Sequence, residues 1–310
     1  MAVQTFQLLI LGSSAATPTV NRNPTAQLLN IAERLFLIDC GESTQIQLRK
    51  YKARFQNINH IFISHLHGDH FFGLPGFLAS MHLLGRKNEL TIFGPPQLKE
   101  IIQLIHKHSD TYLSYPIHYV DTQHISKALI WEDDKVEVYS IPLQHRINTT
   151  GFLFKEKPLP RNIDKYKLEK FKVSISEIHK LKLGLDAIDE SGNTIKNETL
   201  THSPTKPRSY AYCSDTRFFE ALATDIKFVD LLYHESTFLT EMEQRASKTY
   251  HSTAAQAAQM ANLSGTTKLI LGHFSARYDN LNDFLMEAQP FFKNTALAIE
   301  GTLFNIDPII

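Results

Sequence analysis

Cysteine, net charge and long apolar runs are all scarce in this sequence. Its 310 residues include only two cysteines, Cys40 and Cys213, too few for a disulfide framework, so we expect both to be reduced and buried. No segment approaches the ~18 consecutive apolar residues that a membrane-spanning helix requires. The start of the chain has no basic flank before its strand pattern, which argues against a secretory signal. These absences predict a cytoplasmic protein with no membrane partner.

The overall balance of residue types is that of an ordinary globular protein. Hydrophobic residues make up 43% and charged residues 21% of the chain, which excludes the disordered and fibrous classes. The formal net charge is zero, so no field of the whole molecule draws in polyanions. A nucleic-acid partner would therefore have to be held by a local basic patch.

Three imidazoles and one carboxylate lie within six residues, in the segment His65-Leu66-His67-Gly68-Asp69-His70. An apolar run, residues 60–64, precedes them, so the segment is expected to be a loop at the end of a strand. The spacing of two between the first histidines differs from the H-E-x-x-H pattern of a helical hydrolase site. Gly68 is expected to let the chain bend, so that all four side chains face one volume. The cluster predicts a zinc site, although the same ligands suit iron or manganese and a chance polar loop is the alternative.

Three further potential ligands follow predicted strands elsewhere in the chain. His145 follows a strand at 135–141, Asp215 follows one at 209–213, and His273 follows one at 268–271. Functional groups of α/β proteins gather on loops at one end of the strands, so these side chains can converge with the first cluster. Seven ligands then suffice for two metal ions. The alternative, that only the first cluster functions, makes the other positions coincidental.

The rest of the pattern alternates strands with helices and is interrupted once. A hairpin is expected at 28–31 and 35–38, and Asp39 at its end could orient a ligand. Helices are expected at 75–84, 96–106 and 254–262, the last capped by Ser252 or Thr253.

Residues 155–208 interrupt this alternation of strands and helices. Between Arg161 and Lys182 they contain seven lysines or arginines against three carboxylates, so we expect either a basic inserted arm or a solvated helical hairpin.

The pattern H-x-H-x-D-H, followed by a distant His, an Asp and a His, resembles the metallo-β-lactamase superfamily and, within it, the ribonuclease Z family. The resemblance covers nearly the whole chain. It includes the basic insertion and four further segments: Asp39-Cys40-Gly41-Glu42, His234-Glu235-Ser236-Thr237, His251-Ser252-Thr253 and Gly272-His273-Phe274-Ser275-Ala276-Arg277-Tyr278.

This resemblance implies a fold, a ligand assignment and an activity. The fold would be an α/β four-layer sandwich, αβ/βα, formed by 1–310 as a single domain with the arm 155–208 inserted. Two zinc ions would be bound, one by His65, His67 and His145 and the other by Asp69, His70 and His273, with Asp215 bridging both. The protein would be a homodimer that uses its arm to grip precursor tRNA.

The implied reaction removes the 3′ trailer from a tRNA precursor, leaving a 3′-hydroxyl on the tRNA and a 5′-phosphate on the trailer. Asp69 would accept the proton of the nucleophile, and Glu235 paired with His251 would protonate the leaving oxygen. Substrate contacts are expected from four residues in two loops: Arg22, Asn23, Ser275 and Arg277. The first loop, 18–23, resembles the family pattern P-x-K-x-R-N but has Val20 where lysine is expected.

Two other functions remain open on the sequence. A superfamily hydrolase acting on a small ester, lactone or phosphodiester would use the insertion as a lid and would not bind tRNA in a salt-dependent way. A non-catalytic RNA-binding protein would retain the scaffold without needing the intact ligand and acid–base residues.

Overall fold

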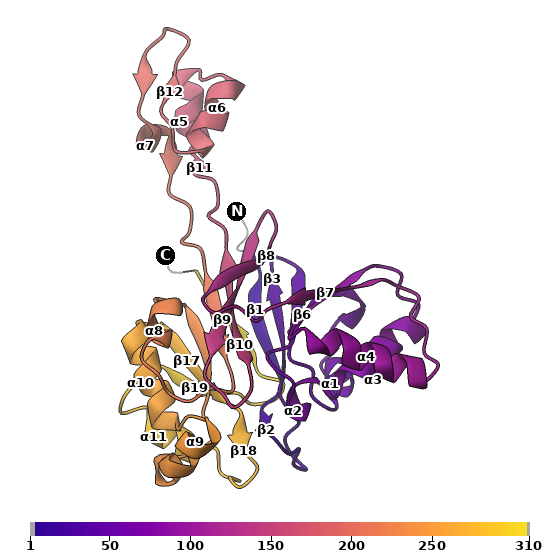
Figure 1. The fold of residues 1–310 in the computed structure, drawn as a ribbon. Coiled ribbons are helices and arrows are strands. Elements are labelled where there is room, and N and C mark those ends of the chain that lie inside the picture. The colour runs from indigo at the N-terminus through magenta and orange to yellow at the C-terminus, as the bar shows by residue number, and fades with distance from the viewer. Residues whose placement is uncertain (1–3, 309–310) are drawn as a thin grey trace. The chain divides into compact units, whose positions relative to one another are not determined.

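Two seven-stranded sheets form the larger of two compact units in the chain. The structure is a computed structural model that describes residues 4–308. Of the described residues, the larger unit contains 4–155 and 208–306, and the smaller one contains Glu156–Pro207 and 307–308. Figure 1 shows both units.

The first sheet has the strand order β20-β1-β3-β4-β5-β6-β7. In that order its strands are Leu303–Asn305, Phe6–Gly12, Ala26–Ile31, Arg34–Ile38, Ile58–Phe62, Leu90–Gly94 and Ile117–Asp121. The predicted hairpin is confirmed as the antiparallel pair β3 and β4, and the strands from β4 to β7 are parallel.

The second sheet has the strand order β19-β17-β16-β15-β10-β9-β8. In that order its strands are Thr295–Leu297, Lys268–Gly272, Leu231–Glu235, Ser209–Cys213, Thr149–Glu156, Val136–Leu143 and Ala128–Glu132. From β15 through β19 the neighbours are parallel, so the ends of β15, β16 and β17 reach the same edge.

The inner faces of the two sheets pack against each other. In β1, Phe6, Leu8 and Ile10 belong to the core between the sheets, and the alternate residue Leu11 faces the other way. This is the period of two that an extended strand imposes on its side chains. Aromatic rings join the layers, because Phe62 of the first sheet lies with its ring centre 5.2 Å from those of Phe152 and Phe154 in the second.

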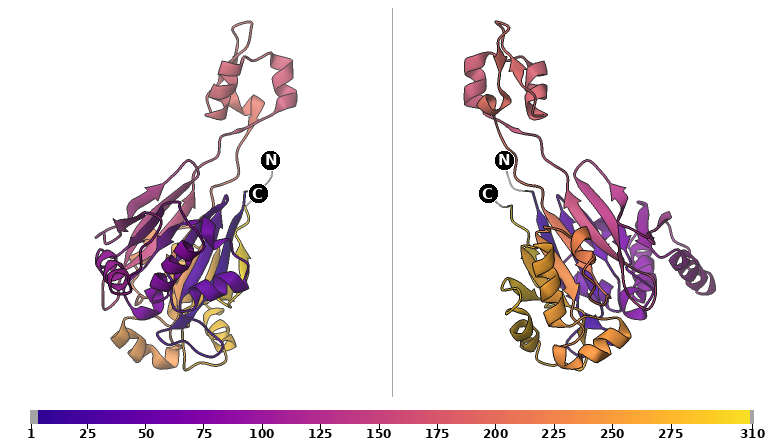
Figure 2. Two further views of the ribbon diagram at one scale, coloured as in Figure 1. Left: turned by 90° about the vertical axis from the view of Figure 1, so that its right-hand side faces the viewer. Right: turned by 60° about the vertical axis from the view of Figure 1, so that its left-hand side comes forward.

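Helices cover both outer faces, and Figure 2 gives two further views of these layers. The outer face of the first sheet packs against α1 (Thr44–Lys50), α3 (Leu74–Leu83) and α4 (Gln97–His108). The second sheet contacts α10 (Ala254–Ser264) and α11 (Asn282–Ala288), with α8 (Leu222–Asp225) against α10. The predicted four-layer α/β sandwich is therefore confirmed.

The predicted helices are present with shifted ends. The capping alternatives for α10 resolve to Thr253, whose side chain accepts a hydrogen bond from the Gln256 N–H in a capping box, and Gly265 ends the helix at a φ of 64°. Ser43, the N-cap residue of α1, has a φ of 68°, and its side chain makes no capping hydrogen bond. Within 4–308 no helix combines the length and apolar character needed to cross a membrane.

Short elements complete the larger unit. They are β2 (Ser14–Ala15) and β18 (Phe274–Ser275), which pair in parallel, the one-turn helix α2 (Gly68–Phe71), α9 (Glu243–Thr249), and the 3₁₀ turns η1 (Phe55–Asn57) and η2 (Thr240–Met242). Both cysteines are buried and unpaired, as expected.

The smaller unit has a core of its own. It contains β11 (Asn162–Ile163), α5 (Lys165–Phe171), α6 (Ile175–Lys182), β12 (Ala187–Ile188), β13 (Thr194–Ile195), α7 (Asn197–Leu200) and β14 (Thr201–His202). Leu181, Ala187, Ile195 and Leu200 form its buried centre. Its boundaries, Glu156–Pro207, lie within one residue of the insertion expected from the sequence.

Candidate metal centre

The seven predicted ligands come together, and each stands just beyond the end of a strand or on the helical turn that follows. His65 lies three residues after β5, and His145 and Asp215 lie two residues after β9 and β15. His273 directly follows β17. The parallel strand ends meet at one edge, so residues about 200 positions apart in sequence converge there.

The short helix α2 carries two of these ligands, and it corrects the expected role of Gly68. His67 is the extended N-cap residue, and Asp69 and His70 lie on the helical turn that follows. Gly68 is the first residue of this turn and not a bend with a positive φ. A Cβ at this position would lie 2.3 Å from the ring of Phe72, an exposed side chain that would have to turn away.

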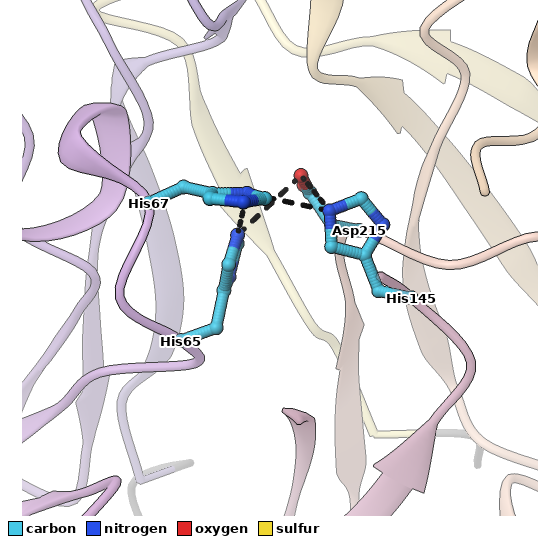
Figure 3. Close-up of side chains that lie close together, drawn as sticks. All are labelled: His65, His67, His145 and Asp215. Atoms are coloured by element: carbon cyan, nitrogen blue, oxygen red, sulfur yellow. Dashed lines mark hydrogen bonds and ion pairs between the residues drawn. The ribbon is translucent and has the colours of Figure 1, made fainter. Parts of the chain in front are cut away.

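One group of potential ligands consists of His65, His67, His145 and Asp215, drawn in Figure 3. His67 Nδ1 lies 2.9 Å from His65 Nε2 and 3.3 Å from His145 Nε2. Asp215 Oδ2 lies 3.6 Å from His65 Nε2 and 3.7 Å from His145 Nε2. Three ring nitrogens and a carboxylate oxygen thus point at one small volume, the donor set that suits zinc.

A second group consists of Asp69, His70 and His273, again beside Asp215. Asp69 Oδ2 lies 3.4 Å from both His70 Nε2 and His273 Nε2. Asp215 Oδ1 lies 3.4 Å from His70 Nε2 and 3.1 Å from His273 Nε2. The two oxygens of Asp215 therefore face different groups, which is the arrangement that a bridging carboxylate needs.

Hydrogen bonds at the far side of four rings hold them in an orientation that suits a cation. His145 Nδ1 lies 2.9 Å from the carbonyl oxygen of Tyr250, which only accepts, so Nδ1 is the donor and Nε2 keeps its lone pair. Thr237 Oγ1 donates to Glu235 and so accepts from His273 Nδ1 at 2.8 Å. The same logic applies to His65 Nδ1, which lies 3.0 Å from the hydroxyl of Ser64.

Asp39 fixes the fourth ring, that of His70, as the sequence predicted it could. Its Oδ2 accepts from His70 Nδ1 at 2.7 Å, from the Tyr212 hydroxyl at 2.5 Å and from Ser64 Oγ at 2.9 Å, and its Oδ1 accepts from the Ser64 N–H at 2.7 Å. All these groups are fully buried. Tyr212, Ser64 and Thr237 were not predicted as functional residues, because contacts between separate strands leave no signal in local spacing.

The electrostatics of the centre also fit a bound cation. Within 4–308, Nε2 of His70 and of His273 are buried and lack a hydrogen-bond partner, which is costly unless a ligand completes them. Burial alone lowers the pKa of His70, but Asp69, Asp215 and Asp39 raise it well above its usual value. The carboxylates thus favour positive charge at this position, and a metal ion would supply it.

The buried carboxylate Glu235 pairs with the partly buried His251 beside the second group. Glu235 Oε1 accepts from His251 Nδ1 at 2.7 Å and from the Thr216 N–H at 2.8 Å, and its Oε2 accepts from the Ser252 N–H at 3.1 Å. Burial opposes the charge on His251, but Glu235 raises the pKa of the imidazole to about 9. The His251 ring stacks on that of His273, with ring centres 5.4 Å apart. Glu235 thus favours the protonated form of His251 at the edge of the centre.

The two loops predicted to bind substrate are brought side by side. The strands β2 and β18 pair, and Arg22 Nη2 donates to the Ser275 carbonyl at 3.3 Å. The Arg277 Nε–H donates to Ser275 Oγ at 3.0 Å. The Asn23 side-chain NH₂ donates to Glu300 at 2.8 Å, so one of its two N–H donors is already used within the protein.

Comparisons with known proteins place the chain in a family. Residues 6–165 match the family model described as "Anti-Pycsar protein Apyc1", a segment that contains the first histidine cluster and His145 but not Asp215 or His273. Ribonuclease Z of Cytophaga hutchinsonii is 52% identical over 97% of this chain and 96% of that protein. Ribonuclease Z of Bacteroides fragilis is 44% identical over 98% of this chain and 100% of that protein.

Solved structures agree with these sequences. Human tRNase Z, short form, has a TM-score of 0.69 at 25% identity and covers 97% of this chain and 99% of its own. The metallo-β-lactamase fold protein YhfI of Bacillus subtilis, with a TM-score of 0.70 at 15% identity over 97% of this chain and 100% of its own, supports the fold alone. The family model matches about half of the chain, whereas the relatives match along its whole length. The chain belongs to the ribonuclease Z family and has the metallo-β-lactamase fold.

Proposed function

We propose that this protein cuts tRNA precursors directly after the discriminator nucleotide and so removes the 3′ trailer. The convergence of seven potential metal ligands, with the hydrogen-bonded pair of Glu235 and His251 at their edge, is the observation that carries the proposal. Full-length similarity to proteins named ribonuclease Z and tRNase Z supports the same substrate class. The reaction adds the elements of water across one phosphodiester bond, giving a 3′-hydroxyl on the tRNA and a 5′-phosphate on the trailer.

The proposed cofactor is a pair of zinc ions. One would be held by His65, His67 and His145, and the other by the group that contains Asp69, while Asp215 serves both. Two such ions supply Lewis acidity that activates water and stabilises charge on the transferring phosphate. The buried nitrogens without partners on His70 and His273 support this use of the centre.

The protein's own groups would move the two protons. Asp69 Oδ2 accepts from the Ala16 N–H at 2.7 Å, which holds the carboxylate in a fixed position inside the centre. We propose that it takes the proton lost by the attacking water. His251, kept protonated by Glu235, would deliver a proton to the departing O3′. General acid–base catalysis of this kind contributes ~10² to 10⁴-fold in rate.

The smaller unit is proposed to bind the body of the tRNA through its basic half. The segment from Arg161 to Lys182 holds the seven cations, whereas residues 186–198 hold four carboxylates, Asp186, Asp189, Glu190 and Glu198, against Lys196 alone. Lys165, Lys172 and Lys182 are exposed. Contacts of such lysines with phosphates position an RNA without reading its sequence. We therefore assign tRNA binding to the surface of α5 and α6.

A homodimer acting in the cytoplasm is the assembly we propose. Ile46 of α1, Leu83 of α3 and the adjacent Phe72 and Leu84 expose large apolar side chains on neighbouring helices. Burying these side chains against a second copy would remove that apolar surface from water. Sedimentation of the wild type should give a dimer, and Ile46→Glu combined with Leu83→Glu should give a monomer. A wild-type monomer would contradict this part of the proposal.

The test of the function is to incubate the protein with a tRNA precursor carrying a 3′ trailer and to map both product ends. A single metal-dependent cut after the discriminator, with the stated end groups, is the expected result. His251→Ala should slow it by ~10² to 10⁴-fold. His118→Ala is the matched control, because His118 lies on β7 with a side chain 57% exposed. If the precursor survives while a small ester, lactone or phosphodiester is hydrolysed, the substrate assignment is wrong.

A further inference from the structure

A cavity of about 230 Å³ opens directly beside the metal centre, on the side of His251. It is lined by residues from the strand-end loops and from α9, among them Gln144, Arg217, Phe218, Phe219, Ser247 and His251. Gln144 precedes the ligand His145, and Arg217 follows the ligand Asp215 by two positions. A group that occupies the cavity is therefore within reach of the reacting atoms, although none of its walls other than His251 has a role in the proposed chemistry.

The walls of the cavity combine aromatic rings with a fixed cation. Phe218 and Phe219 are only half-buried against the core, so parts of their rings remain available to a ligand. The Arg217 Nε–H donates to Gln144 Oε1 at 2.7 Å, and the guanidinium lies over the Tyr250 ring at 5.2 Å. These two contacts orient the exposed side chain beside the cavity. Its terminal nitrogens make no hydrogen bond to any residue that the structure describes.

This combination suits a nucleobase better than a phosphate or an aliphatic group. Single-stranded bases bind to proteins by stacking on aromatic side chains and on arginine planes, while arginine N–H groups donate to acceptors on the base edge. The volume is below the ~300 to 1,000 Å³ of pockets for drug-sized ligands, so it fits one ring system and not a whole nucleotide. Stacking of this kind tolerates all four bases.

We propose that this cavity binds the discriminator base, the last base retained on the mature tRNA. The inference rests on the proposed function, in which the O3′ of that nucleotide departs at the edge of the metal centre where His251 lies, in ring contact with His273. The ribose that carries O3′ must then lie against His251, and its base is the ring system closest to the cavity that His251 lines. Nucleotides of the trailer lie on the other side of the scissile phosphate. Binding of the base would orient the leaving group for proton transfer.

The test compares the cleavage of an intact precursor with that of a precursor whose discriminator nucleotide lacks its base. The loss of one stacked base should reduce kcat/KM of the wild-type protein about 5- to 150-fold. A precursor that lacks the base of the first trailer nucleotide is the substrate control. A failure to cut the intact precursor after the discriminator would overturn the proposed function and this subsite with it. Cutting that does not depend on the discriminator base would overturn the subsite alone.

Two variants test whether the loss of kcat/KM on removing the discriminator base depends on the cavity. Ser247→Trp should fill it from α9, and the intact and abasic precursors should then be cut at rates within about threefold of each other. Lys248→Trp is the matched control, because Lys248 is exposed on the same helix and does not line this cavity. Phe219→Ala removes one wall and should also reduce the difference, with Phe291→Ala, on an exposed phenylalanine, as its control. If the intact and abasic precursors differ in kcat/KM as much with Ser247→Trp and with Phe219→Ala as with the wild type, the assignment is refuted.

Discussion

The substitution Asp39→Asn tests whether a residue outside the seven predicted ligands controls the metal affinity of the centre. The Asp39 carboxylate accepts four hydrogen bonds, and one of them orients His70 so that its Nε2 faces the centre. The amide of asparagine offers only one accepting oxygen. Whichever way it is turned, its NH₂ group faces at least one buried donor that Asp39 satisfied.

The expected magnitudes follow from this arrangement of donors. A buried donor without an acceptor costs ~1 to 3 kcal/mol, so the metal-free Asp39→Asn protein should lose at least that much stability. Loss of the partner that orients a metal-bound histidine typically reduces metal affinity ~10- to 100-fold. That loss corresponds to ~1.4 to 2.7 kcal/mol of binding free energy. Both effects should appear although Asp39 makes no contact with the reacting atoms.

Two measurements separate the effects. Thermal or denaturant unfolding of the metal-free protein reports the stability change, and competition with a chelator of known affinity reports zinc binding. Tyr212→Phe removes one donor to Asp39 without leaving a buried donor unpaired, so its stability loss should be only ~1 kcal/mol. Asp134→Asn is the surface control, since Asp134 is 72% exposed and its ion pair with Arg34 contributes ~1 kcal/mol or less. Wild-type zinc affinity in Asp39→Asn would refute the reasoning.

Three further outcomes are expected. Glu235→Gln should lower the pKa of His251 from about 9, because the Glu235 carboxylate contributes most to raising it. As the pH rises, His251 should then lose its proton earlier, and the cleavage rate should begin to fall at a lower pH. An unchanged pH–rate profile would contradict the role of the pair. Removing metal with a chelator should abolish cleavage and lower the Tm, with recovery on adding zinc, since a ligand that binds only the folded protein stabilises it; cleavage that survives chelation would exclude a metal centre. Replacing Lys165, Lys172 and Lys182 by alanine should flatten the salt dependence of tRNA binding, because the slope of log K against log salt becomes shallower by ~0.7 to 0.9 for each phosphate that a lysine no longer neutralises. A slope equal to that of the wild type would show that these lysines do not bind the RNA.

Local sequence was sufficient to predict most of the elements. The strand at 135–141, the hairpin 28–31 with 35–38, and the helix that begins after Thr253 were all expected and are present. Their signals are short-range, since the alternation of apolar residues and the capping side chains act within a few positions. The errors were local as well. Gly68 begins a helical turn without a positive φ, whereas its residue type had suggested a bend in the loop.

The seven potential metal ligands could be predicted from the sequence, because histidine and aspartate at strand ends have a recognisable residue type and spacing. Tertiary structure decided how these side chains are arranged. The oxygens of Asp215 face two separate groups, and the far nitrogens of the rings meet Asp39, Thr237 and the Tyr250 carbonyl. It also decided that a cavity opens beside His251. These features arise where separate strands and loops pack together, so they depend on distances between residues far apart in the chain, which no local pattern specifies.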